Sequence, residues 1–208
     1  IKMKKILMII ASTMILSPIN AESFNKIMRS QSYSIDCMAS EKCIDGVKQI
    51  KSISDISNSF PNVDYSMITA EVNVMLDILK RIKVKVFLAD QKYFPVRYRG
   101  IYSTKRNNFY INKRYANNPR SILFTMRHEG WHVAQDCKAG IDNMRLDIIL
   151  AEKYIPQTYR DYVEEVYTGE PDQIPFEKGA FWASVTKNVT LMALDACDRG
   201  HDFYFHAN

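Results

Sequence analysis

The residues of this sequence that can do chemistry together are His128, Glu129 and His132, which form an H-E-x-x-H motif. Residues four positions apart lie on one face of a helix, so the two imidazoles can bind the same metal ion. Zn²⁺ binds imidazole nitrogens at about 2.0–2.1 Å, and catalytic zinc sites keep one position open for water. Glu129 lies about 100° further round the helix, where it can act as a general base toward that water. The motif therefore predicts metal-assisted hydrolysis.

The segment that carries the motif has the features of a buried helix. Asn118 and Pro119 provide a start and Gly140 an end, which is the usual asymmetry of helix termini. The flanking positions 126, 130, 131, 133 and 134 are uncharged. We therefore expect a helix that ends by Gly140 and lies beneath an active-site cleft.

The rest of the pattern predicts an α+β fold. Apolar residues at helical spacing predict helices over 41–56 and 64–82, and alternation predicts a strand at 84–88, with two more strands at 100–103 and 109–112. Further helices are expected over 143–154, 156–167 and 175–197. The apolar face of the last helix would consist of Phe181, Trp182, Val185, Val189, Met192 and Ala196. The expected fold is one domain, residues 22–208, with two N-terminal helices, a small antiparallel or mixed sheet, and a helical half that carries the motif helix and a C-terminal glutamate helix.

The motif resembles that of the zincin metallopeptidases, and within them the gluzincins, in which a glutamate from a later helix is the third protein ligand. The metzincin branch requires Gly at 135 and His or Asp at 138, where this chain has Gln135 and Lys138. The His-Val-x-Gln sequence that starts at His132 is similar to that of small bacterial gluzincin-like domains. The resemblance implies a Zn²⁺-dependent peptidase that acts on a peptide or protein substrate, with Glu129 as its general base.

Two glutamates compete for the place of the third ligand that this resemblance implies. Glu177 is favoured because it opens the last expected helix, and because the small residues at 179 and 180 would let that helix approach the motif helix closely. At 181 a phenylalanine stands where the family has an acidic residue that orients a histidine. The rival is Glu152, whose place 20 positions after His132 resembles the thermolysin-like spacing.

A peptidase also needs a hydrogen-bond donor for the carbonyl oxygen that gains charge, and a surface that binds the peptide. His201, Tyr159 and Tyr167 are the expected donors. The strand at 109–112 lies just before the motif helix. We therefore expect it to pair with an extended peptide at a sheet edge.

The N-terminal segment predicts export. Lys4 and Lys5 precede an apolar run at 6–16, and the small Ala21 follows a break at Ser17 and Pro18. This order is typical of a secretory signal peptide, so residues 1–21 are expected to be removed. The remaining chain would carry no stable membrane span, and the expected location is secreted or periplasmic.

The cysteines support the same compartment. Cys37, Cys43, Cys137 and Cys197 are an even number, which in an exported chain predicts two disulfides. Three pairings are open. The short-range choice joins Cys37 to Cys43 and Cys137 to Cys197.

The charge balance argues against a nucleic-acid partner. The 208-residue chain carries a net charge of +5, and without Lys2, Lys4 and Lys5 it has 25 basic and 23 acidic residues, a net +2. That is too weak for a basic nucleic-acid footprint. Two other interpretations stay open. One is an exported module that binds metal without turnover; the other is a metal-free interaction protein that binds through the basic and aromatic stretch between Arg97 and Arg120.

Overall fold

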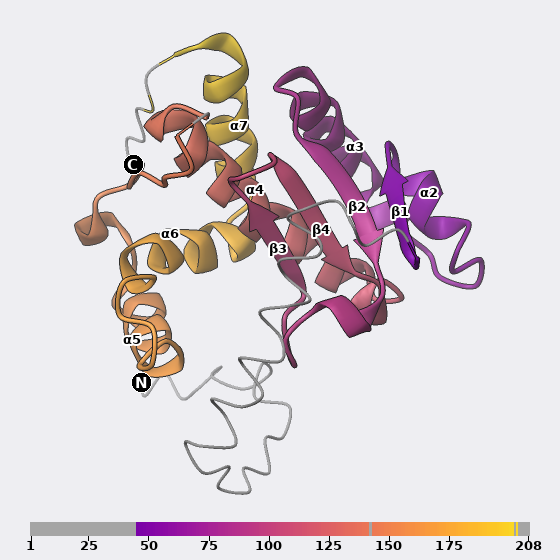
Figure 1. The fold of residues 1–208 in the computed structure, drawn as a ribbon, viewed down its shortest axis with the longest axis horizontal. Coiled ribbons are helices and arrows are strands. Elements are labelled where there is room, and N and C mark those ends of the chain that lie inside the picture. The colour runs from indigo at the N-terminus through magenta and orange to yellow at the C-terminus, as the bar shows by residue number, and fades with distance from the viewer. Residues whose placement is uncertain (1–44, 142, 202, 204–208) are drawn as a thin grey trace, which may run out of the picture.

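The computed structural model describes residues 45–141, 143–201 and 203 and shows the predicted α+β fold (Figure 1). The expected signal peptide, Cys37 and Cys43 lie outside these residues. The described part has a four-stranded sheet and six α-helices: β1 (Val47–Ile50), α2 (Ile53–Ser57), α3 (Ser66–Arg81), β2 (Lys85–Ala89), β3 (Gly100–Ser103), β4 (Asn108–Asn112), α4 (Pro119–Ala139), α5 (Gln157–Val166), α6 (Ile174–Val185) and α7 (Val189–Arg199). No helix in this part of the chain has the length and hydropathy needed to cross a bilayer.

The sheet is mixed, with the strand order β1-β2-β4-β3. β2 is antiparallel to β1 and parallel to β4, and β3 is antiparallel to β4. Because β4 is paired on both sides, the prediction that the strand at 109–112 binds a peptide at a sheet edge is wrong. Within the described residues β3 is paired on one side only, so the edge near the motif helix belongs to β3.

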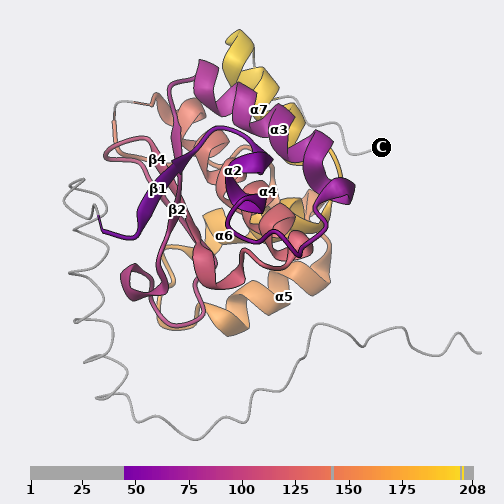
Figure 2. The ribbon, with the colours of Figure 1, turned by 90° about the vertical axis from the view of Figure 1, so that its right-hand side faces the viewer.

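Side chains alternate between the two faces of the sheet, as the two-residue period of a strand requires. Val86 and Phe109 point into the main core, which α3 and α4 complete on one face. Phe87 and Tyr110 point to the other face, where their rings stack at 5.2 Å. Figures 1 and 2 show α3 and α4 on the same side of the sheet. This alternation explains why β2 could be recognised from the sequence.

Helix α4 carries the motif and is the element around which the helical half packs. Two glycines let its neighbours come close. A Cβ at Gly130 would lie 2.9 Å from Thr190 of α7, and a Cβ at Gly179 of α6 would lie 2.7 Å from Trp131 of α4. The expectation that small residues after Glu177 permit a close approach is confirmed by the second contact.

The helix expected over 41–56 is wrong for the residues described. Gly46 has a positive φ of 73°, and β1 and the short α2 follow it. The apolar residues there are valine and isoleucine, whose branched side chains favour strands. Pairing with β2 therefore outweighs the helical spacing of these residues.

The stretch at 143–154 is also not a helix. Met144 has a positive φ of 56°, and the only regular structure in the described part of this stretch is a 3-10 turn at Glu152–Tyr154. The chain instead runs back along α4. Asp147 N–H donates to Gln135 O, and Lys138 Nζ donates to Ile148 O.

The single helix expected over 175–197 is divided into α6 and α7. The chain turns at Asn188, which has a left-handed φ of 67°. The expected apolar face is therefore not continuous, and Val185 and Met192 are 40% and 56% exposed. The turn lets α6 and α7 pack against α4 as separate helices. By contrast, the helices expected over 64–82 and 156–167 are confirmed as α3 and α5.

The predicted pairing of Cys137 with Cys197 is confirmed. The bond has an S–S distance of 2.09 Å and joins the last turns of α4 and α7, which are 60 residues apart in the sequence. It therefore closes a long loop that contains the whole helical half after the motif.

Replacing both cysteines, Cys137→Ser with Cys197→Ser, is expected to lower the free energy of unfolding by about 4 kcal/mol, because the unfolded chain regains the freedom of a 60-residue loop. Urea titration followed by circular dichroism measures this change. A similar drop is expected for the wild-type chain in reductant. Equal stability of the double variant and the oxidised wild type would show that the bond does not stabilise the fold.

Candidate metal centre

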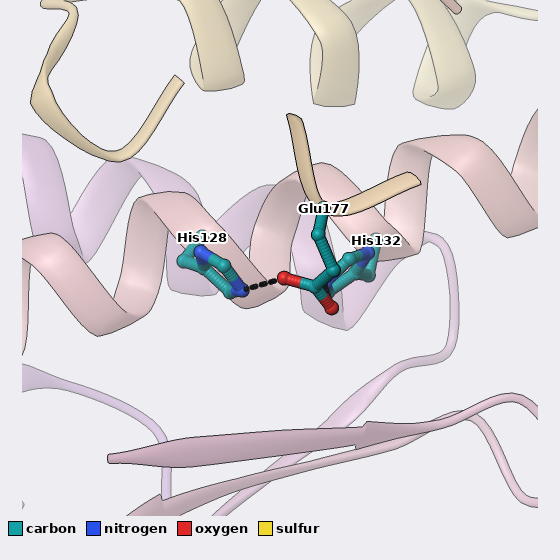
Figure 3. A group of neighbouring side chains, drawn as sticks. All are labelled: His128, His132 and Glu177. Carbon is teal, nitrogen blue, oxygen red and sulfur yellow. Dashed lines mark ion pairs between the residues drawn. The ribbon is translucent and has the colours of Figure 1, made fainter. Parts of the chain in front are cut away.

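His128, His132 and Glu177 form one buried cluster (Figure 3). The two histidines project from neighbouring turns of α4, and Glu177 reaches between their rings from α6. His128 Nε2 lies 3.2 Å from Glu177 Oε2, and His132 Nε2 lies 3.3 Å from Glu177 Oε1. The possible ligand atoms all lie within 4.8 Å of one another, and each residue is 8% exposed. The favoured trio of the sequence analysis is thus brought together.

The local sequence places Glu177 at this point. Pro175 lies in the first turn of α6, where its missing N–H costs no hydrogen bond. Gly179, half a turn after Glu177, lies against Trp131 of α4. The carbonyl of Phe176 accepts a hydrogen bond from Gln135 Nε2 at 3.2 Å. The start of α6 is therefore fixed to α4 on both sides of the glutamate.

The charges of the cluster depend on one another. Burial alone would raise the pKa of Glu177, but the imidazoles of His132 and His128 outweigh burial and hold this pKa well below its ordinary value. Burial alone would lower the pKa of His132, but the Glu177 carboxylate in particular raises it to about 9. Buried charges are costly unless they are paired or bound to a metal. In this cluster the Glu177 carboxylate is paired with the two histidines.

Gln135 orients the ring of His132. Its Oε1 lies 2.8 Å from His132 Nδ1, while its Nε2 bonds the carbonyl of Phe176. The amide therefore accepts an N–H from Nδ1 and leaves Nε2 of His132 directed at Glu177. This arrangement resembles the outer-shell support that metal-binding histidines have in general.

His128 contacts Glu177 through Nε2 and is otherwise held by aromatic rings. Phe181 packs edge-on against it with ring centres 5.0 Å apart, and Phe124 stacks on it at 6.1 Å. Its buried Nδ1 has no hydrogen-bond partner among the residues that the structure describes. The phenylalanine at 181 thus takes over the orienting role through packing.

Glu129 lies beside the cluster and outside its set of ligand atoms. Burial raises the pKa of its carboxyl, and the nearby histidines oppose that shift. The backbone N–H of Tyr102 donates to the carboxylate, and a Cβ at Gly100 would lie 2.9 Å from Glu129 Oε1. The edge strand β3 therefore fixes this carboxylate from one side.

Two tyrosine hydroxyls come to the cluster from different elements. Tyr167 follows α5 and donates a hydrogen bond to Glu177; burial and the Glu177 charge raise its pKa. Tyr98 precedes β3 and interacts with the charges of Glu177 and Glu129. Burial and these carboxylates, together with Glu170, raise the pKa of Tyr98 to about 12. Both phenols therefore remain protonated donors at neutral pH.

Three predicted site residues lie elsewhere. Glu152, the rival ligand, sits in the 3-10 turn and pairs with Lys178 at 2.7 Å. His201 lines a cavity beside the disulfide at the end of α7. Tyr159 packs against the second apolar core, around Ile155 and Ala180. None of the three belongs to the cluster.

Sequence reasoning missed Gln135, Tyr98 and Gly100 as site residues. Gln135 carried a usable signal, because it lies three positions after His132 on the same helix face. Tyr98 and Gly100 carried none. Their place depends on how β3 lies across α4, which local spacing does not encode.

The donor set fits a divalent metal ion. Two imidazole nitrogens and one carboxylate oxygen are a combination found in catalytic zinc sites. The chain matches no protein-family model, no curated protein and no solved structure. The function must therefore be argued from the site itself.

Glu177→Ala is expected to lower metal affinity at least tenfold, because it removes one of three ligands, while Glu152→Ala leaves affinity unchanged. Equilibrium dialysis with metal analysis measures both. The opposite pattern would make Glu152 the ligand. Equal loss in both variants would point to damage to the packing of α6.

In the metal-free chain His132 is expected to titrate near pH 9, above the ordinary histidine value of about 6.5. The pair with Glu177 then stabilises the fold fully below pH 6.5, and this contribution is lost as the pH rises through 9. NMR titration of the imidazole protons with a chelator present tests this. Glu177→Gln should lower the value and Glu152→Gln should not; an unchanged pKa in Glu177→Gln would refute the pairing.

Proposed function

We propose that this chain is an exported, zinc-dependent peptidase of the gluzincin type. The observation that carries the proposal is the position of Glu177 between His128 and His132, with Glu129 beside this trio and outside it. This is three protein ligands plus a neighbouring base, which is the arrangement of catalytic and not of structural zinc sites. The disulfide is compatible with an oxidising compartment and so supports export.

Different residues of the chain would have different roles in hydrolysis. His128, His132 and Glu177 would hold a zinc ion, which would supply Lewis acidity and lower the pKa of a water molecule. Glu129 accepts the proton of the attacking water and passes it to the leaving amine. Its position beside the proposed ligands, outside the set of possible ligand atoms, suits this double role.

The two tyrosines near the cluster could stabilise the negative charge that develops on the substrate. The scissile carbonyl oxygen becomes negative in the transition state and needs a donor fixed in place beforehand. Tyr167 donates a hydrogen bond to Glu177, and Tyr98 lies near enough to interact with the charges of Glu177 and Glu129. We assign the stabilising role to Tyr167, with Tyr98 as a second donor.

The edge of β3 suits an extended peptide. Asn112 N–H donates to Arg99 O at 2.8 Å, and ladder bonds alternate along an antiparallel pair. The backbone groups of Gly100 and Tyr102 therefore point away from β4. The Tyr102 N–H already donates to the Glu129 carboxylate, so a peptide added at this edge would pass that carboxylate and pair with the other outward-facing backbone groups.

One feature favours the alternative, an exported metal-binding module without turnover. Phe181 stands beside His128 in place of a hydrogen-bonding group, so this ligand lacks the polar support that His132 has. Ring packing can hold the geometry of a ligand without raising its basicity. Turnover, and not metal binding, separates the two functions.

Glu129→Gln is expected to reduce peptide hydrolysis roughly 100- to 10,000-fold with metal content unchanged, because the base is lost and the ligands are kept. The assay is a mixed peptide library incubated with zinc-loaded protein and read by mass spectrometry. Glu165→Gln, at an exposed position of α5, is the matched control. Wild-type protein with one zinc per chain that cleaves no peptide would favour the binding module. Unchanged hydrolysis in Glu129→Gln would assign the base elsewhere.

A further inference from the structure

Arg99 is a charged side chain near the metal centre that the proposed chemistry does not use. It directly precedes β3, is exposed, and has its guanidinium over the rings of Phe124 at 5.4 Å and Tyr115 at 5.6 Å. Phe124 in turn stacks on His128. Across residues 45–141, 143–201 and 203, no carboxylate forms an ion pair with Arg99. Arg99 is therefore a cation with no acidic partner among these residues, and the ring of Phe124 lies between it and His128.

The stacking prepares this side chain for an anion. Cation–π contacts restrain the long arginine side chain, so less rotational freedom is lost on binding. The planar guanidinium binds a carboxylate through two parallel hydrogen bonds. Arg99 therefore has the geometry of a carboxylate receptor at one end of the site.

The direction of β3 relative to α4 indicates which part of a bound peptide would approach Arg99. Gly100 lies against Thr125 and Glu129, and the Tyr102 hydroxyl donates to Asp136 at 2.6 Å. β3 and α4 therefore run the same way along the site. An antiparallel peptide, the more stable pairing, would run in the opposite direction on the edge of β3. Its residues after the scissile bond would approach Arg99.

We propose that Arg99 binds a carboxylate of the peptide substrate on the C-terminal side of the scissile bond. This inference rests on the proposed function, because it places the peptide on the same edge strand and metal centre. The carboxylate is either the C-terminus of a short peptide or an acidic side chain. The aromatic rings of Phe124 and Phe181, which meet at 6.2 Å beside His128, would contact the neighbouring side chain of the peptide.

Binding without cleavage tests the inference. The full chain with Glu129→Gln, loaded with zinc, is titrated by calorimetry with N-acetylated hexapeptides in three forms. The first has a free C-terminal carboxylate, the second is its amide, and the third is the amide with one glutamate in its C-terminal half. Arg99→Gln and Arg99→Lys are made in this background, and Arg145→Gln, an exposed arginine in the loop after α4, is the matched control.

A carboxylate-bearing form is expected to bind roughly 10- to 100-fold more tightly than the amide, since hydrogen bonds to charged groups are stronger than neutral ones. Arg99→Gln should abolish this difference, Arg99→Lys should retain part of it, and Arg145→Gln should leave it intact. The form that carries the preference identifies the source of the carboxylate. A preference that survives Arg99→Gln, or equal binding of all three forms, overturns the inference.

These experiments distinguish failure of the peptidase proposal from failure of the proposed role of Arg99. If the chain with Glu129 intact cleaves peptides but Arg99→Gln does not alter the carboxylate preference, the peptidase stands and the role of Arg99 falls. If the preference depends on Arg99 but nothing is cleaved, the site binds peptides without turnover.

Discussion

The structure depends on one buried carboxylate placed between two buried imidazoles. Removing Glu177 from water is unfavourable unless opposite charge or hydrogen bonds replace its hydration, and the same holds for a protonated histidine. Pairing the carboxylate with an imidazole therefore lowers the free-energy cost of burying both groups. This mutual need requires α6 to lie close to α4. Gly179 permits that approach because any larger side chain would collide with Trp131.

The same helix, α4, also packs against β3, α7 and α3. On one side it faces β3, whose Tyr102 contacts Glu129 through its backbone and Asp136 through its hydroxyl. On another side Gly130 admits α7. A third contact is the ion pair of Arg127 with Glu71 of α3, at 2.6 Å. A helix fixed from several directions keeps its two histidines in a constant relation to Glu177.

Those parts of the site that follow from local spacing were predictable from the sequence. His128, Glu129 and His132 share one helix, so their relation is set by its 3.6-residue period. Glu177 was identified less directly, from the small residues that follow it. Strand β2 was recognised because side chains of different character alternate along residues 84–88. Each of these predictions used information contained within a few residues.

The errors arose where distant contacts override local pattern. Val47 and Ile50, which have helical spacing, lie in strand β1 because β2 offers a partner. The apolar run after 175 is divided at Asn188 because α7 must turn back onto α4. Tyr98 and Gly100 enter the site through the path of β3 across the motif helix. None of these events has a signal within the segment itself.

The distance in sequence between the ligands has a consequence for the growing chain. Glu177 follows His132 by 45 positions. During synthesis the motif helix is therefore complete while its third ligand has yet to be added, and a nascent chain that stops before α6 has two imidazoles and no carboxylate between them. Because a domain generally folds as a unit, the cluster forms only after α6 has been made. A copy that ends before α6 thus lacks the carboxylate of the cluster.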